Sequence, residues 1–205
     1  MGFYEERVLP RVVDLACSVG EFRDWRRRAV EGLSGRVVEV GFGSGLNVAF
    51  YPPEVDVVLA VEPSAAARRL AEKRVRGSEI LIEHIGFDGQ SIPLGDSSCD
   101  AALSTFTLCT IPDGRRALAE LYRLVRPGGR LHFLEHGLSP DPKVAAWQQR
   151  IEPLHKRLAG GCHLTRDPLE MIGEAGFELA RFEQHYAKGP RAWSYFTIGV
   201  AVRPR

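Results

Sequence analysis

The feature that most constrains the fold is the regular alternation of short apolar runs with stretches of helical character. The apolar runs occupy residues 37–40, 57–61, 80–85, 101–104 and 131–134. The helical stretches between them cover residues 46–50, 64–76 and 114–125. Nearly continuous apolar strands separated by helices are typical of a parallel sheet that helices cover on both faces. The sequence therefore predicts an α/β fold.

The last part of the chain has a different pattern. Two extended stretches, residues 177–186 and 193–202, follow a short predicted helix over 168–175. The turn-forming residues 187–190 join the two stretches, which predicts an antiparallel hairpin. With the five runs above, this hairpin predicts a doubly wound three-layer sandwich. Its seven-stranded sheet is mostly parallel, with an antiparallel last strand.

Two further segments flank or interrupt this pattern. Residues 3–19 place apolar side chains at spacings of three and four, which predicts an amphipathic helix, and residues 21–31 continue as a charged helix. We expect residues 1–31 to form a helical lid and residues 137–165 a substrate-side insertion. Because 205 residues suit one domain and no repeat or linker occurs, a single domain over 1–205 is predicted.

The amino-acid composition limits the kinds of partner that we expect for this chain. The 27 Lys and Arg residues nearly cancel the 26 Asp and Glu residues, which argues against nucleic acid as the main partner. No window approaches the ~20 apolar residues of a membrane span, and no signal peptide is evident. With four scattered cysteines that are expected to stay reduced, we predict a cytoplasmic protein. A run of arginines is predicted to be a solvated helix face: Arg23, Arg26, Arg27 and Arg28.

A glycine loop follows the first apolar run directly. Its sequence is G-F-G-S-G over residues 41–45, and such a strand-to-helix turn lets backbone N–H groups approach a ligand closely. Alone, this is a weak signal, because many glycine loops are only turns. Leu46 occupies the sixth position, where the nicotinamide-dinucleotide fingerprint has Gly or Ala, and the chain has no room for a second domain. Both facts count against an oxidoreductase.

Three acidic residues accompany the loop. Glu39 precedes it by two residues and can order the loop or receive a ligand's ammonium group. Glu62 ends the next strand, at the spacing where an acid meets ribose hydroxyls, and Asp88–Gly89 follow the third strand, where a carboxylate could accept from an adenine amine. Each acid alone is more simply read as a strand end or a helix cap. Together, at successive carboxyl strand ends, they predict a ligand-binding edge.

Four blocks between residues 37 and 135 resemble the class I S-adenosylmethionine-dependent methyltransferases, particularly the quinone-ring methyltransferases. These blocks are V-V-E-V-G-F-G-S-G, A-V-E-P-S, D-G-Q-S-I-P-L-G-D-S-S-C-D and R-P-G-G-R-L. Four more are similar to the thiol methyltransferases of animal internal membranes and lipid droplets: S-T-F-T-L-C-T-I, F-L-E-H-G, W-Q-Q-R-I-E-P-L and G-G-C-H-L-T-R-D. We expect the chain to lack the apolar N-terminal anchor of those proteins, so membrane residence is not carried over.

The resemblance implies a Rossmann-like fold and a role for each matching residue. The glycines would surround the methionine part of S-adenosylmethionine with Glu39 near its amino group, Glu62 would hold the ribose, and Asp88 and the Gly89 backbone the adenine. The end of the fourth strand would line the methyl-transfer point, and residues 127–129 would form a tight turn. The implied cofactor-binding residues are Glu39, Gly41, Phe42, Gly43, Gly45, Glu62, Pro63, Asp88, Gly89, Thr105, Phe106 and Leu108.

Two histidines are candidate general bases. His136 follows the fifth strand at the ligand-binding edge, although a structural hydrogen bond to a neighbouring loop is an equal alternative. His163 is the second candidate, in a turn-rich segment. No metal is predicted, because His155, Cys162 and His163 lack a fourth ligand and a standard spacing.

Acceptor-binding residues are predicted at both ends of the site. Phe3 and Tyr4 would reach over the cofactor from the lid, while Trp147 would belong to a substrate wall in the insertion, with Leu154 and Leu158. Trp193 and Tyr195 are expected to be mainly core residues of a strand. Arg166 is expected to pair with a nearby acid, Asp167 or Glu170.

The predicted function is methyl transfer from S-adenosylmethionine to a small, apolar acceptor, with a thiol favoured. A lipid amine or a quinone-like ring carbon is the alternative acceptor. A non-catalytic module that binds the cofactor and regulates a partner is the alternative from another class.

Overall fold

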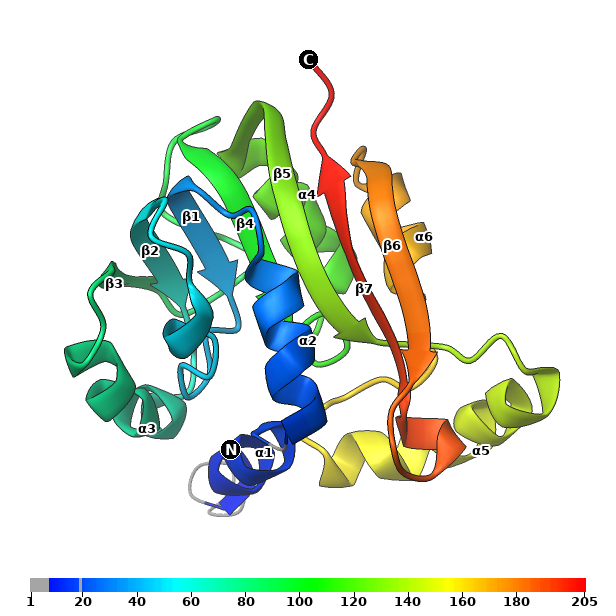
Figure 1. The fold of residues 1–205 in the computed structure, drawn as a ribbon. Helices are drawn as coiled ribbons and strands as arrows, with labels where there is room; N and C mark the ends of the chain where they lie inside the picture. Colours follow the sequence, from blue (N-terminus) through cyan, green and yellow to red (C-terminus); the bar gives the residue numbers. More distant parts are fainter. Residues whose placement is uncertain (1–7, 19) are drawn as a thin grey trace.

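The computed structural model describes residues 8–18 and 20–205 and contains a seven-stranded sheet in the order β3-β2-β1-β4-β5-β7-β6 (Figure 1). The strands are β1 (Gly35–Val40), β2 (Val55–Val61), β3 (Leu81–Gly86), β4 (Cys99–Thr105), β5 (Val125–His136), β6 (Glu178–Tyr186) and β7 (Tyr195–Val202). Strand β7 pairs antiparallel with both β5 and β6, while the other pairs are parallel. The predicted fold class is therefore confirmed, and the antiparallel strand lies inside the sheet.

Helices cover both faces of this sheet. They are α1 (Leu9–Cys17), α2 (Gly20–Val30), α3 (Ala65–Arg76), α4 (Gly114–Leu124), α5 (Pro142–Leu158) and α6 (Pro168–Glu174), with short 3-10 turns η2 (Val48–Phe50) and η3 (Arg191–Trp193). One core packs Leu118, Leu121 and Ile172 of α4 and α6 on the sheet. The opposite core packs Val30 of α2 and Ala71 of α3. Figure 1 shows α2 in front of the sheet and α4 and α6 behind it.

Two sequence predictions about elements are wrong. The helix expected over 46–50 is only the turn η2, because Pro52 and Pro53 follow it and Tyr51, before the first proline, is extended with φ −56° and ψ 129°. Strand β3 was expected to be buried on both faces, yet most of its side chains are exposed or partly exposed. It is an edge strand whose one neighbour in the sheet is β2.

The N-terminal segment lies over the glycine loop. Asp14 of α1 accepts a hydrogen bond from Ser44 Oγ at 2.5 Å and forms an ion pair with Arg74 of α3 at 2.9 Å. The predicted helix over 3–19 is described from Leu9 to Cys17, and the proposed contacts of Phe3 and Tyr4 lie outside the described residues. Across the part of the chain that the structure describes, no helix is long and apolar enough to cross a membrane.

Candidate active site

The glycine loop leaves β1 through three glycines with positive φ: +69° at Gly41, +59° at Gly43 and +76° at Gly45. A Cβ on Gly41 would lie 2.1 Å from Thr107 Oγ1, so this position requires glycine. A Cβ on Gly43 would meet only the Gly41 carbonyl oxygen, at 3.7 Å. The loop therefore presents bare backbone with open space beside Gly43, the geometry that a closely approaching ligand needs.

Glu62, at the end of β2, is joined to the loop. Its two carboxylate oxygens accept hydrogen bonds from the Gly43 N–H at 2.7 Å and from the Ser64 N–H at 2.8 Å. Burial raises the pKa of Glu62, while these two N–H bonds oppose that shift. Ser64 also caps α3 by accepting from the Ala67 N–H. The structure thus brings Glu62 and the loop together; the contact of Glu62 with a ribose stays a prediction.

Glu39 is buried, and both of its oxygens are bound within the protein. Oε1 accepts from Asn47 Nδ2 at 2.8 Å, and Oε2 accepts from the Tyr51 hydroxyl. Burial is the main reason why the pKa of Glu39 rises to about 7. Asn47 also donates to Thr105 Oγ1 at 2.9 Å, so this network links the glycine loop to the end of β4.

Arg26 completes this network, and the sequence prediction for it is wrong. It was grouped with a solvated arginine face, yet its residue is only 5% exposed. Its guanidinium donates to Asn47 Oδ1 at 2.8 Å and to Thr105 Oγ1 at 3.0 Å, and lies 4.7 Å from the centre of the Phe106 ring. The sequence did contain a signal for the burial of Arg26, because this residue stands four residues after Phe22 and four before Val30, on the apolar face of α2.

The end of β4 is held by a buried acid that the sequence reasoning missed. Glu135 Oε2 accepts from the backbone N–H groups of Thr107 at 2.9 Å and Leu108 at 3.0 Å. Its Oε1 accepts from Ser104 Oγ at 2.6 Å. Burial raises the pKa of Glu135 to about 7. Phe106 in this loop has a positive φ of 55°. A glutamate inside the largely apolar segment F-L-E-H was the sequence signal that could have revealed this role.

Asp88 and Gly89 lie at the same edge, beyond β3. Asp88 is exposed and accepts from the backbone N–H and the side-chain amide of Gln90, both at 2.9 Å. These hydrogen bonds lower the pKa of Asp88. A Cβ on Gly89 would lie 2.4 Å from Cγ2 of Val40 in β1, so glycine lets this turn pack against the strand that carries the loop. Adenine contacts by these residues stay a prediction.

His136 ends β5 and is buried. Neither ring nitrogen makes a hydrogen bond of normal geometry with the described residues, although the Ala192 carbonyl lies close enough to favour the protonated ring. Burial is the larger effect and lowers the pKa of His136. The predicted alternative, a structural hydrogen bond to a neighbouring loop, would use this Ala192 carbonyl and stays a prediction. His136 keeps an available ring nitrogen in a buried place.

An aromatic cluster, Phe22, Trp25, Phe106 and Phe196, lies beside this imidazole. The Phe196 ring is 5.3 Å from His136, 5.4 Å from Phe106 and 5.3 Å from Phe22, measured between ring centroids. The cluster therefore connects the end of β4 to the end of β5 through apolar contacts.

Other candidates have partners elsewhere. His163 Nδ1 is 3.1 Å from Glu152 Oε1, and burial lowers its pKa. The acid pairing expected for Arg166 is wrong, because its guanidinium donates to the carbonyls of Leu108, Ile111 and Pro112 at the end of the β4 loop. Among the described residues, no group of three or more His, Cys, Asp or Glu is arranged to hold a metal ion.

The insertion is only partly buried, and several of its large apolar side chains are exposed. Trp147 of α5 is 50% exposed and lines a hollow with Trp193, Lys143 and Arg191. The strand position expected for Trp193 is wrong: it ends η3 and is 41% exposed, whereas Tyr195 is buried. Leu154 and Leu158 are also exposed.

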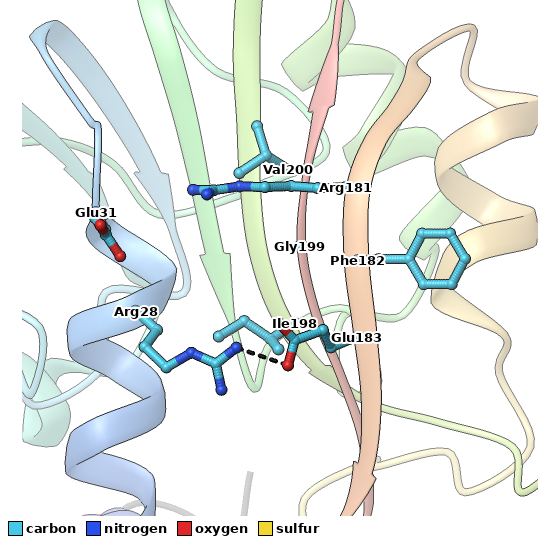
Figure 2. A pocket seen from close by; sticks show the side chains of 8 residues that line it. All are labelled: Arg28, Glu31, Arg181, Phe182, Glu183, Ile198, Gly199 and Val200. Atoms are coloured by element: carbon cyan, nitrogen blue, oxygen red, sulfur yellow. Dashed lines mark ion pairs between the residues drawn. The ribbon is translucent and has the colours of Figure 1, made fainter.

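A second hollow lies between α2 and the β6–β7 pair (Figure 2). Figure 2 shows the 2.7 Å ion pair that joins Arg28 to Glu183 at its rim. Its lining includes none of the predicted site residues: Arg28, Glu31, Arg181, Phe182, Glu183, Ile198, Gly199 and Val200. The glycine loop therefore stays the predicted site.

Comparisons with known proteins cover the part of the chain that contains the glycine loop. Residues 38–133 match the family model of the methyltransferase domain. The chain is 35% identical to the thiol S-methyltransferase TMT1B of Rattus norvegicus over 162 residues, covering 75% of this chain and 65% of the relative. It is 32% identical to the ubiquinone/menaquinone biosynthesis C-methyltransferase UbiE of Syntrophotalea carbinolica over 149 residues, covering 68% and 62%. The chain thus spans slightly less than two thirds of these relatives.

A solved geranyl diphosphate methyltransferase in complex with SAM shares the fold, with a TM-score of 0.67 at 15% identity over 88% of this chain and 84% of that chain. The strand order, the glycine loop on β1 and the matched region from β1 to β5 lead to one assignment. Residues 38–133 thus form a methyltransferase domain.

Proposed function

We propose that this chain transfers the methyl group of S-adenosylmethionine to the sulfur of a small, apolar thiol. The observation that carries the proposal is the buried imidazole of His136, whose ring nitrogens lack hydrogen bonds of normal geometry, at the carboxyl edge of the sheet. The similarity to a rat thiol S-methyltransferase supports a sulfur acceptor. The aromatic cluster at the same edge supports an apolar one.

The residues at the edge fit the cofactor. The glycine loop is a cradle that side chains would fill, with open space at Gly43, and Glu62 and Asp88 offer carboxylates on neighbouring strand ends. In this proposal the loop holds the methionine part, Glu62 the ribose diol, and Asp88 with the Gly89 backbone the adenine. When bound, S-adenosylmethionine supplies a methyl group that its sulfonium already activates.

The chain's own residues then have three tasks. The hydrogen-bond network of Glu39, Asn47 and Arg26 fixes the loop, which serves the alignment that can lower a barrier by ~7–11 kcal/mol. Phe106 and Phe196 exclude water from the acceptor sulfur. His136 takes the proton of the thiol on a ring nitrogen; burial keeps this imidazole neutral, and a thiol with a pKa of about 8.5 needs only modest help.

Cofactor binding is tested first, by thermal unfolding with S-adenosylhomocysteine and with NAD. A hundredfold excess over the dissociation constant stabilises by ~2.7 kcal/mol, so we expect a clear rise in Tm with S-adenosylhomocysteine and none with NAD. Gly43→Val should abolish the rise, because the side chain fills the open space beside the loop. A rise with NAD alone would end the methyltransferase proposal.

Turnover is tested with labelled S-adenosylmethionine and a panel of alkyl thiols, lipid amines and quinol-like phenols. We expect a thioether product, and His136→Ala should lower kcat by about 10²–10⁴ while leaving the affinity for S-adenosylhomocysteine nearly unchanged. Because burial lowers the pKa of His136, its neutral form should persist below pH 6.5, the ordinary value of an imidazole.

Three other outcomes of the turnover experiment would each contradict one part of the proposed function. Methylation of the quinol-like ring alone would replace the thiol by the acceptor type of the bacterial relative. Binding with no product across the panel would favour a regulatory module. An unchanged rate in His136→Ala would remove this residue as the base.

A further inference from the structure

Two cysteines that the proposed methyl transfer does not use lie side by side at the edge of the site. Cys109 follows the loop at the end of β4, and Cys162 lies in the turn after α5. The His163 N–H donates to the Cys109 carbonyl at 2.7 Å, which fixes the two backbone segments next to each other. Both thiols are free; Cys109 is 4% exposed, whereas Cys162 is partly exposed. Cys162 is thus the more exposed of the two residues, and Cys109 is enclosed.

The surroundings make the two thiols chemically unequal. They interact directly, and this interaction lowers the pKa of Cys162 and raises that of Cys109. A hydrogen bond from His155 also favours the Cys162 thiolate, while burial and the charge of Glu135 keep Cys109 protonated. A partly exposed thiolate beside a protected thiol is the arrangement of a nucleophilic and a resolving cysteine.

We propose that Cys109 and Cys162 form a reversible oxidation site that hydrogen peroxide converts to a disulfide. The Cys162 thiolate attacks one peroxide oxygen; an S–O bond forms, the O–O bond breaks, and the departing hydroxide takes a proton to become water. The Cys109 sulfur then attacks the sulfur of the Cys162 sulfenic acid. The S–S bond forms as the S–O bond breaks, and the proton of Cys109 leaves with the hydroxyl as a second water. Two thiols are oxidised and one peroxide is reduced to two waters.

The disulfide would tie two parts of the candidate site together. It would join the turn after α5 to the segment that follows Thr105–Leu108, whose position Glu135 and Arg166 fix. Cys162 also acts electrostatically on Cys17 of α1, so a Cys17–Cys162 bridge is the competing product that the experiment must distinguish. Cys99 is 1% exposed at the start of β4 and serves as an internal control.

The experiment uses the full chain, and its readout does not depend on methyl transfer. Cys99→Ser protein is treated with hydrogen peroxide, alkylated with N-ethylmaleimide and digested with trypsin without reduction. Cleavage after Arg and Lys places Cys162 in peptide 158–166, Cys109 in peptide 77–115 and Cys17 in peptide 12–23. We expect a crosslink between 77–115 and 158–166 that lacks two hydrogen atoms and disappears on adding dithiothreitol. In unoxidised wild type, Cys162 should react with iodoacetamide roughly tenfold faster than Cys99 at neutral pH.

Cys162→Ser and Cys109→Ser are the matched variants, and each should abolish the crosslink while keeping the Tm of the reduced protein near that of wild type. If one of them unfolds, the alkylation rates and the crosslink of the Cys99→Ser protein still decide the question. A crosslink from 12–23 to 158–166, or further oxidation of Cys162 with no crosslink, would overturn the proposal. Loss of methyl transfer with the crosslink still formed would refute the proposed function and leave this inference standing.

Discussion

Glu135→Gln is the substitution that most directly tests how burial shapes this site. The wild-type carboxylate accepts three hydrogen bonds, from Ser104 Oγ and from the N–H groups of Thr107 and Leu108. A glutamine oxygen can accept from both N–H groups, and its amide can donate to the Ser104 oxygen. The substitution therefore keeps the contacts and removes only the buried charge.

The magnitude follows from the pKa of Glu135, which burial raises from 4.5 to about 7. Between these values the folded protein binds more protons at this group than the unfolded chain does, so stability falls as pH rises through the window. The loss of folding stability caused by the buried Glu135 charge is absent below pH 4.5 and complete above pH 7, where it reaches about 3 kcal/mol. The stability of Glu135→Gln relative to wild type should therefore increase by about 2–3 kcal/mol from pH 5 to pH 8.

Thermal and urea unfolding of both proteins at pH 5, 6, 7 and 8 measures this difference. For a chain of this size, we expect the Tm of the variant relative to wild type to rise by roughly 5–10 °C across the series. Glu39 also titrates near 7, but it is present in both proteins and cancels in the difference. Glu135→Ala is the control: it leaves two buried N–H groups without an acceptor and should destabilise at every pH. A Glu135→Gln difference that stays flat from pH 5 to pH 8 would refute the reasoning.

The remaining predictions concern packing and a buried cation. Gly41→Ala should cost about 2–4 kcal/mol in urea unfolding, because the new Cβ overlaps Thr107 at a backbone φ of +69°. Gly173→Ala, on α6 with no neighbour within 4 Å, should be neutral or slightly stabilising; equal losses for both would contradict the overlap. Arg26→Gln should lose about 3 kcal/mol or more, since Glu39 keeps its buried position without this cation, and a loss below 1 kcal/mol would contradict the network.

Much of the fold could be predicted from local pattern. The order of strands and helices, the parallel sheet and the closing hairpin all came from apolar runs and turn residues, and the structure bears them out. The misplaced elements have local causes that the pattern hid. Two prolines reduced the helix after the glycine loop to a turn, and an edge position left β3 exposed, including its apolar Leu81.

The roles of individual side chains were harder to predict, because they depend on which side chains are buried or contacted by segments that are distant in the sequence. Arg26 is of a residue type that is usually exposed, and it becomes buried because α2 packs against β5 and β7, where its guanidinium reaches Thr105 at the end of β4. Arg166, expected to pair with an adjacent acid, instead binds carbonyls more than fifty residues away in the sequence. Sequence spacing along one segment carries no information about such contacts.

The sequence by itself determined the α/β architecture and the residues at the edge of the sheet, because strand ends, glycines and acids follow one another at fixed spacing. It also carried the resemblance of residues 38–133 to the methyltransferase domain. Only the tertiary structure decided which polar groups lie buried and with what partners. It gave His136 ring nitrogens without ordinary hydrogen bonds, and it set Cys109 against Cys162 across more than fifty residues. The physical reason is that burial and proximity, which set the protonation and reactivity of these groups, are properties of the packed chain.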